Sequence, residues 1–174
     1  MQIRTRMCTS LDGYISNADG LPVQLSDCEF DPETYGFVEL QAQSDAVLMG
    51  HTTLMPALEV ADRWPWSDVE VFVLASERPK GTPDEVVIDS HPERLLERIR
   101  EANRGGDVHL IGGPTTIETY RQLGVIDEFG LVVLPILARG GMQLTPAIKA
   151  ENRLELKNVR ELPRGAVELL YATP

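Results

Sequence analysis

The sequence has 174 residues, of which 43% are hydrophobic and 25% charged, and its formal net charge is −11. This length and composition are typical of one globular domain with a sizeable core, and we expect residues 1–174 to fold as a single unit. The acidic charge argues against non-specific binding to nucleic acid or to an anionic membrane surface. No apolar run approaches the roughly 18 residues that a membrane span needs.

The two cysteines, Cys8 and Cys28, are too few to build a disulfide framework. The N-terminal stretch lacks the long apolar centre of a signal peptide and predicts a first strand instead. We therefore expect a cytoplasmic protein with reduced thiols, and a bridge between the two cysteines is the less favoured alternative. The sequence has three histidines, at His51, His91 and His109. They are scattered without metal-ligand spacing, so we expect no metal site.

Apolar runs rich in β-branched residues predict eight strands, at residues 3–8, 46–49, 69–74, 86–88, 108–111, 128–134, 154–160 and 166–171. Through the first two thirds of the chain these runs alternate with helical patterns, which implies parallel βαβ units. The last third has strands without an intervening helix and predicts an antiparallel hairpin. The expected fold is α/β, with a mixed, mostly parallel sheet and helices on both faces.

Four helices are expected between these strands. The first has Asp31 as its N-cap and Pro32 at the first helical position, with Phe30 and Tyr35 spaced as a hydrophobic staple. A short helix follows Gly50. The other two have clear apolar faces and end at glycines, within residues 91–105 and 114–124.

Three of the predicted parallel strands end in small and polar residues. Such strand ends meet at one edge of a sheet, where ligands of open α/β folds bind. Helix N-termini at this edge suit phosphate, and glycine lets an anion approach the bare N–H groups. Each motif alone also fits a plain tight turn, but together they favour a dinucleotide site: Gly50, His51, Thr52 and Thr53; Ser76, Arg78 and Lys80; Gly112, Gly113, Thr115 and Thr116.

Arg78 bears on which dinucleotide is bound. A guanidinium matches a phosphate monoester bidentately, which favours NADPH with its 2′-phosphate. The neighbouring Glu77 points the other way, because an acidic residue can read an unphosphorylated ribose.

Four stretches, in this order, resemble the dihydrofolate reductase fold and in particular the RibD C-terminal reductase family: MCTSLDGYIS, SDAVLMGHTTL, WPWSDVEVFVLASERP and VHLIGGPTTIETYRQLGVIDEFGLVVLPIL. The match runs nearly end to end. Two departures stand out: His51 replaces an arginine that relatives often have, and the chain has no signature of the zinc deaminase domain found in riboflavin-pathway relatives. The chain therefore resembles the stand-alone branch of the family.

The resemblance implies a three-layer αβα sandwich around about eight or nine strands, a homodimer, and NADPH as hydride donor. The residues it places at the cofactor are Gly50, His51, Thr52, Thr53, Ser76, Arg78, Gly112, Gly113, Pro114, Thr115 and Thr116. Of these, Ser76 and Arg78 would hold the phosphate of the adenosine ribose. Asp12 and Gly13 would line the side of the nicotinamide and the substrate.

The reaction expected from this resemblance is hydride transfer to a small heterocycle, pterin-like or, as in riboflavin biosynthesis, 5-amino-6-(5-phosphoribosylamino)uracil. Asp12 is the best-placed carboxyl to supply the proton, with Glu33, Glu39 or a bound water as alternatives. Tyr35 and Trp66 are candidates to stack on the heterocycle or to pack in the core. The alternative functions are a non-catalytic nucleotide-binding or ligand-sensing module and a flavin-dependent reductase.

Overall fold

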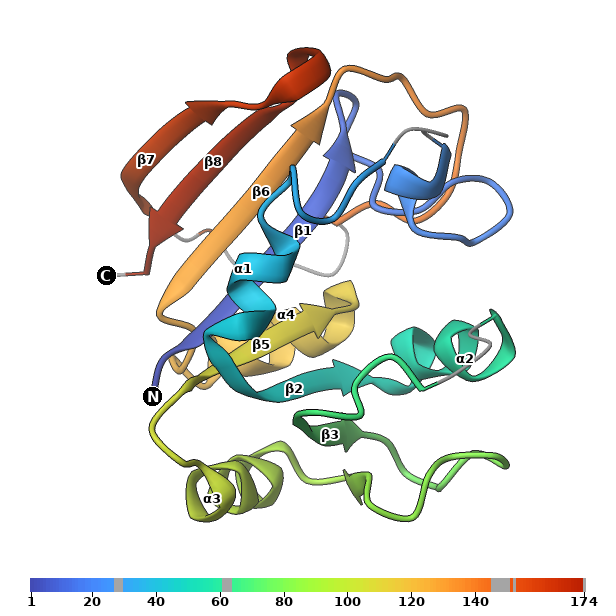
Figure 1. Ribbon diagram of the computed structural model, residues 1–174, viewed down its shortest axis with the longest axis vertical. Coiled ribbons are helices and arrows are strands. Elements are labelled where there is room, and N and C mark those ends of the chain that lie inside the picture. Colours follow the sequence, from blue (N-terminus) through green and yellow to red (C-terminus); the bar gives the residue numbers. More distant parts are fainter. Residues whose placement is uncertain (27–29, 61–63, 145–150, 152, 174) are drawn as a thin grey trace.

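The computed structural model describes residues 1–26, 30–60, 64–144, 151 and 153–173, so Cys28 lies outside the described residues. The described chain forms an eight-stranded sheet with the order β4-β3-β2-β5-β1-β6-β8-β7 (Figure 1). Strands β1 to β6 are parallel, and β8 pairs antiparallel with both β6 and β7. The predicted mixed, mostly parallel sheet with an antiparallel hairpin is confirmed.

Each of the eight predicted strands is present, with ends within two residues of those expected. They are β1 (Ile3–Ser10), β2 (Ser44–Gly50), β3 (Glu70–Leu74), β4 (Val87–Asp89), β5 (Asp107–Gly112), β6 (Glu128–Leu134), β7 (Glu155–Glu161) and β8 (Val167–Ala172).

Three of the four predicted helices also lie where the sequence places them: α2 (His51–Val60), α3 (Pro92–Ala102) and α4 (Pro114–Gln122). Two short 3₁₀ helices cover Val23–Ser26 and Pro163–Gly165.

The first helix corrects our prediction, because α1 (Phe37–Ala42) begins at Phe37 and not at Pro32. Gly36 takes the left-handed conformation, with a φ of 71°, and separates the helix from the turn before it. Asp31 accepts hydrogen bonds from the N–H groups of Glu33 and Thr34, as a cap does, but the structure it caps is only a turn.

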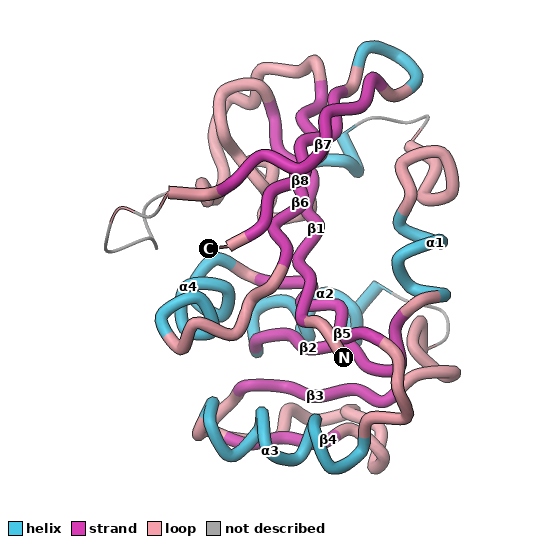
Figure 2. Tube along the Cα trace, turned by 90° about the vertical axis from the view of Figure 1, so that its left-hand side faces the viewer, coloured by secondary structure: helices cyan, strands magenta, loops and turns pink. Residues whose placement is uncertain are grey.

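Helices cover both faces of the sheet, and Figure 2 shows α1 and α4 on opposite sides. On one face, α3 and α4 pack Leu95, Ile99 and Ile117 against Leu48 and Leu110 of the central strands in a continuous apolar core. The alternation of β1 places Ile3 and Met7 on this face too.

The core of the opposite face is divided into two clusters. One lies beneath α1 and the loop before it and contains Tyr35, Val132 and Leu134. The other lies beneath α2 and contains Met49 and Leu54. The boundary falls at β2, β5 and β1, where the strand order reverses, and this is the place at which ligands bind in open α/β sheets.

Candidate functional site

A cleft of about 600 Å³ lies on this divided face, between α1 and α2. Its volume is in the range of small-molecule and cofactor sites. Most of the residues predicted at the cofactor phosphates line it: Gly50, His51, Thr52, Thr53, Gly113, Pro114, Thr115 and Thr116. The sequence therefore predicted the glycine and threonine motifs that the fold brings to one cleft.

Two helices begin at this cleft, each directly after a strand. β2 and β5 are parallel neighbours, and their last residues lead into α2 at His51 and α4 at Pro114. Neither helix has an acidic residue in its first turn, and no side chain caps the N-terminus of α4. First-turn N–H groups without side-chain caps provide partial positive charge for an anion.

The two motifs contact each other through their glycines. A Cβ atom at Gly50 would lie 2.2 Å from Thr116 Oγ1, and one at Gly113 would lie 3.9 Å from Thr53 Oγ1. Gly50 therefore permits the first turn of α4 to approach the end of β2 this closely.

We expect Gly50→Ala to lower the free energy of unfolding by about 1–3 kcal/mol, because the new methyl group overlaps Thr116 Oγ1. Thr116→Ala removes that oxygen and leaves the nearest atom, Cβ of residue 116, at 3.5 Å, an ordinary contact. The double variant should therefore be about as stable as Thr116→Ala alone. Urea denaturation of the four proteins measures this, and strictly additive losses would contradict the contact.

The charge around the cleft differs from that of the whole chain. The sequence contains 27 acidic residues, yet none of the described residues that line the cleft is Asp or Glu, and Arg6 is the arginine among them. An acidic protein whose cleft excludes carboxylates and exposes helix N-termini is suited to an anionic ligand.

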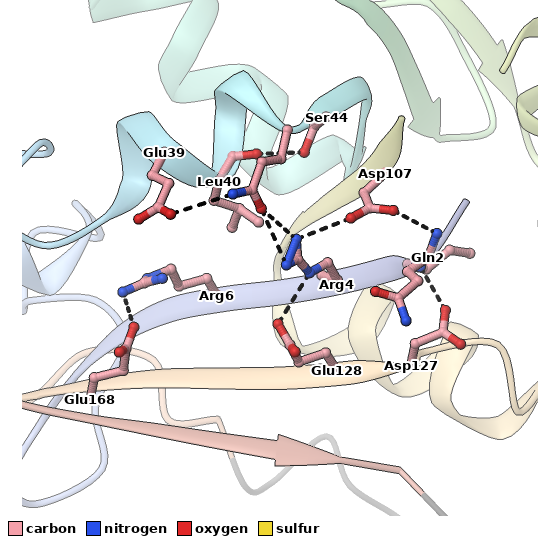
Figure 3. Close-up of polar contacts among 12 residues, drawn as sticks. Gln2, Arg4, Arg6, Glu39, Leu40, Ser44, Asp107, Asp127, Glu128 and Glu168 are labelled. Atoms are coloured by element: carbon pink, nitrogen blue, oxygen red, sulfur yellow. Dashed lines mark hydrogen bonds and ion pairs between the residues drawn. The ribbon is translucent and has the colours of Figure 1, made fainter. Parts of the chain in front are cut away.

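Arg6 lies in the inner part of the cleft, on β1. Its guanidinium donates to the carboxylate of Glu168 (Figure 3). The guanidinium also lies over the ring of Phe37, 5.5 Å from the ring centroid. Glu168 also accepts from Arg160 Nε at 2.9 Å. Burial lowers the pKa of Arg6, while the charge of Glu168 opposes the shift.

His109, on β5, also lines the cleft. Its side chain is 7% exposed and lines the cleft next to Arg6. Burial lowers the pKa of His109 to about 4, although a hydrogen bond with the backbone of Arg6 acts in the opposite direction and raises it. The ring is therefore neutral at physiological pH.

Asp12, the predicted proton donor, does not line the cleft. Its carboxylate accepts hydrogen bonds from the Ser10 hydroxyl at 2.6 Å and the Ala138 N–H at 2.9 Å, and these lower its pKa. Gly13 closes a turn by donating to the Ser10 carbonyl oxygen at 3.0 Å, and it too lies outside the cleft lining. The Asp-Gly pair thus has the turn role that was its alternative interpretation.

Arg78 and Ser76 are exposed and do not line the cleft either. The two terminal nitrogens of Arg78 donate to the carbonyl oxygens of Pro83, at 2.9 Å, and Val86, at 2.6 Å. Arg78 therefore stabilises its own loop. Its hydrogen bonds and its place outside the cleft lining do not support the predicted contact with a 2′-phosphate.

Tyr35 is also placed away from the substrate side. It is 1% exposed, stacks on Phe30 with centroids 5.2 Å apart, and accepts a hydrogen bond from Arg164 at 3.1 Å. The predicted contact between Phe30 and Tyr35 is thus observed, although it spans a turn and not the start of a helix. Tyr35 packs in the core, which was the alternative to its predicted contact with substrate.

Among the described residues, His, Cys, Asp and Glu side chains form no group of three or more that could hold a metal ion. The helices among these residues are all too short or too polar to cross a membrane.

Comparison with known proteins agrees with this architecture. Residues 67–167 match the family model of the RibD C-terminal domain, and the chain belongs to this family. The uncharacterized protein YyaP of Bacillus subtilis (strain 168) is 27% identical, over 95% of this chain and 91% of that protein. The chain thus has the fold of riboflavin-pathway reductases, as its resemblance predicted.

Two solved structures share this fold. The crystal structure of a putative riboflavin biosynthesis protein from Shewanella sp. PV-4 superposes with a TM-score of 0.82 at 26% identity, covering 100% of this chain and 99% of that one. A diaminohydroxyphosphoribosylaminopyrimidine deaminase/5-amino-6-(5-phosphoribosylamino)uracil reductase from Thermotoga maritima gives a TM-score of 0.74 at 16% identity, covering 99% of this chain and 56% of that one.

Proposed function

We propose that this protein is an NADPH-dependent reductase that transfers hydride to a small heterocycle, pterin-like or aminouracil-like. The observation that carries the proposal is the pair of helix N-termini, α2 and α4, that open into one cleft without an acidic side chain in either first turn. A dinucleotide has two linked phosphates. A pair of adjacent anion sites therefore fits a dinucleotide better than it fits a ligand with a single phosphate.

The residues of the cleft fit the phosphates of such a cofactor. Gly50 and Gly113 bare the backbone at the two helix starts, and their motifs meet across the cleft. The hydroxyl groups available as hydrogen-bond donors belong to Thr52, Thr53, Thr115 and Thr116.

The remaining lining suits a flat ring. Phe37, Trp66 and Ile111 contribute apolar surface, and Cys8 of β1 also lines the cleft. When bound, NADPH supplies the hydride that reduces a carbonyl or imine. The chain's own contribution is to orient the acceptor ring against the cofactor and to exclude water around it.

The proton required by the reduction comes, in this proposal, from a bound water. No carboxyl group is present among the described residues of the cleft lining. Cys8 lies there, but burial raises the pKa of its thiol to about 12, so it holds its proton too tightly to be an efficient donor at neutral pH.

Titration with NADPH, with binding measured by fluorescence and by calorimetry, tests the proposal. We expect saturable binding and, with a suitable pterin or aminouracil, loss of the absorbance of the reduced nicotinamide. No binding at millimolar cofactor would refute the reductase. Binding without oxidation by any acceptor would favour the nucleotide-binding module instead, and a yellow purified protein would favour a flavin-dependent enzyme.

The preference for NADPH over NADH and the homodimer stay predictions that follow from the family resemblance. The cytoplasmic location stays a prediction from the two cysteines and the N-terminal stretch.

A further inference from the structure

Two residues that line the cleft each contain a buried polar atom with no hydrogen-bond partner. The atoms are Nε2 of His109 and Nε of Arg6. Native proteins leave few buried polar atoms unpaired, because each has lost its bonds to water without replacement. Two other unpaired atoms, in Thr5 and Trp64, belong to residues that do not line this cleft.

The two cleft atoms have opposite hydrogen-bonding character. The backbone hydrogen bond of His109 to Arg6 uses the other ring nitrogen, Nδ1, because Nε2 has no partner. A backbone carbonyl accepts, so Nδ1 carries the proton and Nε2 presents a lone pair. Arg6 Nε–H is by contrast a permanent donor.

The charges around His109 keep this arrangement fixed. Burial favours the neutral ring, and the charges of Arg6 and Arg4 on the neighbouring strand β1 also disfavour protonation. Arg4 is the register partner of His109, and Arg6 follows two residues later on the same face of β1. The acceptor and the donor therefore belong to adjacent strands.

Other groups hold Arg6 in place from its far end. Glu168 binds the terminal nitrogen of the guanidinium, and Phe37 packs against its plane. A Cβ atom at Gly36 would lie 2.8 Å from Arg6 Nη2, so the left-handed glycine leaves room for the guanidinium. The orientation of Arg6 is thus set without a ligand.

We propose that His109 determines the specificity of the cleft: its Nε2 accepts a hydrogen bond from a ring N–H or amino group of the bound heterocycle, and Arg6 Nε–H donates to an acceptor on the same edge. The ligand class is therefore a flat heterocycle that carries a donor and an acceptor on one edge. This assignment rests on the proposed function in one respect, that the acceptor ring occupies the inner part of the cleft.

A pair of small probes tests this assignment. Uracil carries ring N–H groups beside carbonyl oxygens, and its N,N′-dimethyl derivative has the same ring without the donors. We expect wild-type protein to bind uracil at least about tenfold more tightly than the dimethyl compound, measured by NMR titration. The same titrations are made with and without saturating NADP⁺.

His109→Leu removes the acceptor and retains a side chain of similar bulk, whereas His109→Gln keeps an amide oxygen within reach of the Nε2 position. The preference for uracil should fall to less than about threefold in the Leu variant and return in the Gln variant. In wild-type protein, uracil should also shift the side-chain nitrogen resonance of His109 and leave those of His51 and His91 unmoved. A purely structural histidine would not show this shift.

An unchanged preference in His109→Leu, no preference in the wild type, or no binding of either probe would overturn the assignment. Its failure is distinguishable from that of the reductase, because the probes are titrated without the cofactor as well. Discrimination by His109 in a protein that does not bind NADPH would refute the reductase and support the recognition pair.

Discussion

Glu168→Gln should lower the free energy of unfolding by about 3 kcal/mol, because it removes the carboxylate that forms an ion pair with the buried guanidinium of Arg6. The side chains of Glu168 and Arg6 are only 7% and 14% exposed, so water compensates little of the loss. Urea denaturation of the variant and the wild type measures the difference.

Glu155→Gln is the matched control in the same hairpin. Glu155 pairs with Lys157 at 3.4 Å, but its side chain is 70% exposed, and the loss should stay below about 1 kcal/mol. Replacing both buried partners, as Arg6→Met with Glu168→Leu, should recover most of the stability that Glu168→Gln loses. Equal losses in the two single glutamine variants would contradict this account of the pair.

Thr115→Asp should weaken NADPH binding by roughly a hundredfold, because it places a negative charge where the proposed function places a phosphate. Thr115 is exposed, is the second residue of α4 and lines the cleft. An aspartate in the first turn of a helix is itself stabilising, by about 0.3–1 kcal/mol. Binding and stability should therefore change in opposite directions.

Thr115→Asn isolates the charge, since it has the shape of aspartate without it. In fluorescence titration, the asparagine variant should bind NADPH with an affinity within a few-fold of that of the wild type. In thermal unfolding, the aspartate variant should be at least as stable as the wild type. If both variants lose affinity equally, the N-terminus of α4 is not the phosphate site.

The fold followed from the sequence because most strands are apolar runs bounded by turn residues, and because short connections leave few topologies. The polar strand β7 is the exception, since all seven of its residues are exposed. The ends of β6 agree with the prediction to the residue. The predicted start of α1, at Pro32, was wrong because the helical pattern of the sequence continues from Asp31 across Gly36. Only the approach of Arg6 from β1 shows why the chain takes a left-handed turn there.

The parts of the cleft that depend on strand topology could be predicted from the sequence. The side chains whose roles depend on hydrogen-bond partners from other parts of the fold could not. Glycine and threonine motifs at the ends of β2 and β5 must meet once these strands are parallel neighbours. The partners of Asp12 and Arg78 could not be predicted: Asp12 accepts a hydrogen bond from the Ala138 N–H in the segment after β6, and Arg78 donates to the Val86 carbonyl oxygen of its own loop. For Arg6 a signal existed: in IRTRMCTS every second residue is apolar or small, which leaves arginines on one face of a central strand.

The position of β5 constrains the order in which the protein assembles. This strand is made after β2, β3 and β4, yet it lies between β2 and β1 and joins them through backbone hydrogen bonds. In a nascent chain that ends before Asp107, β1 is therefore not joined to the group formed by β2, β3 and β4, and both have exposed edges. We expect folding to be slow and non-vectorial, since the central pairings wait until the ribosome has delivered most of the polypeptide.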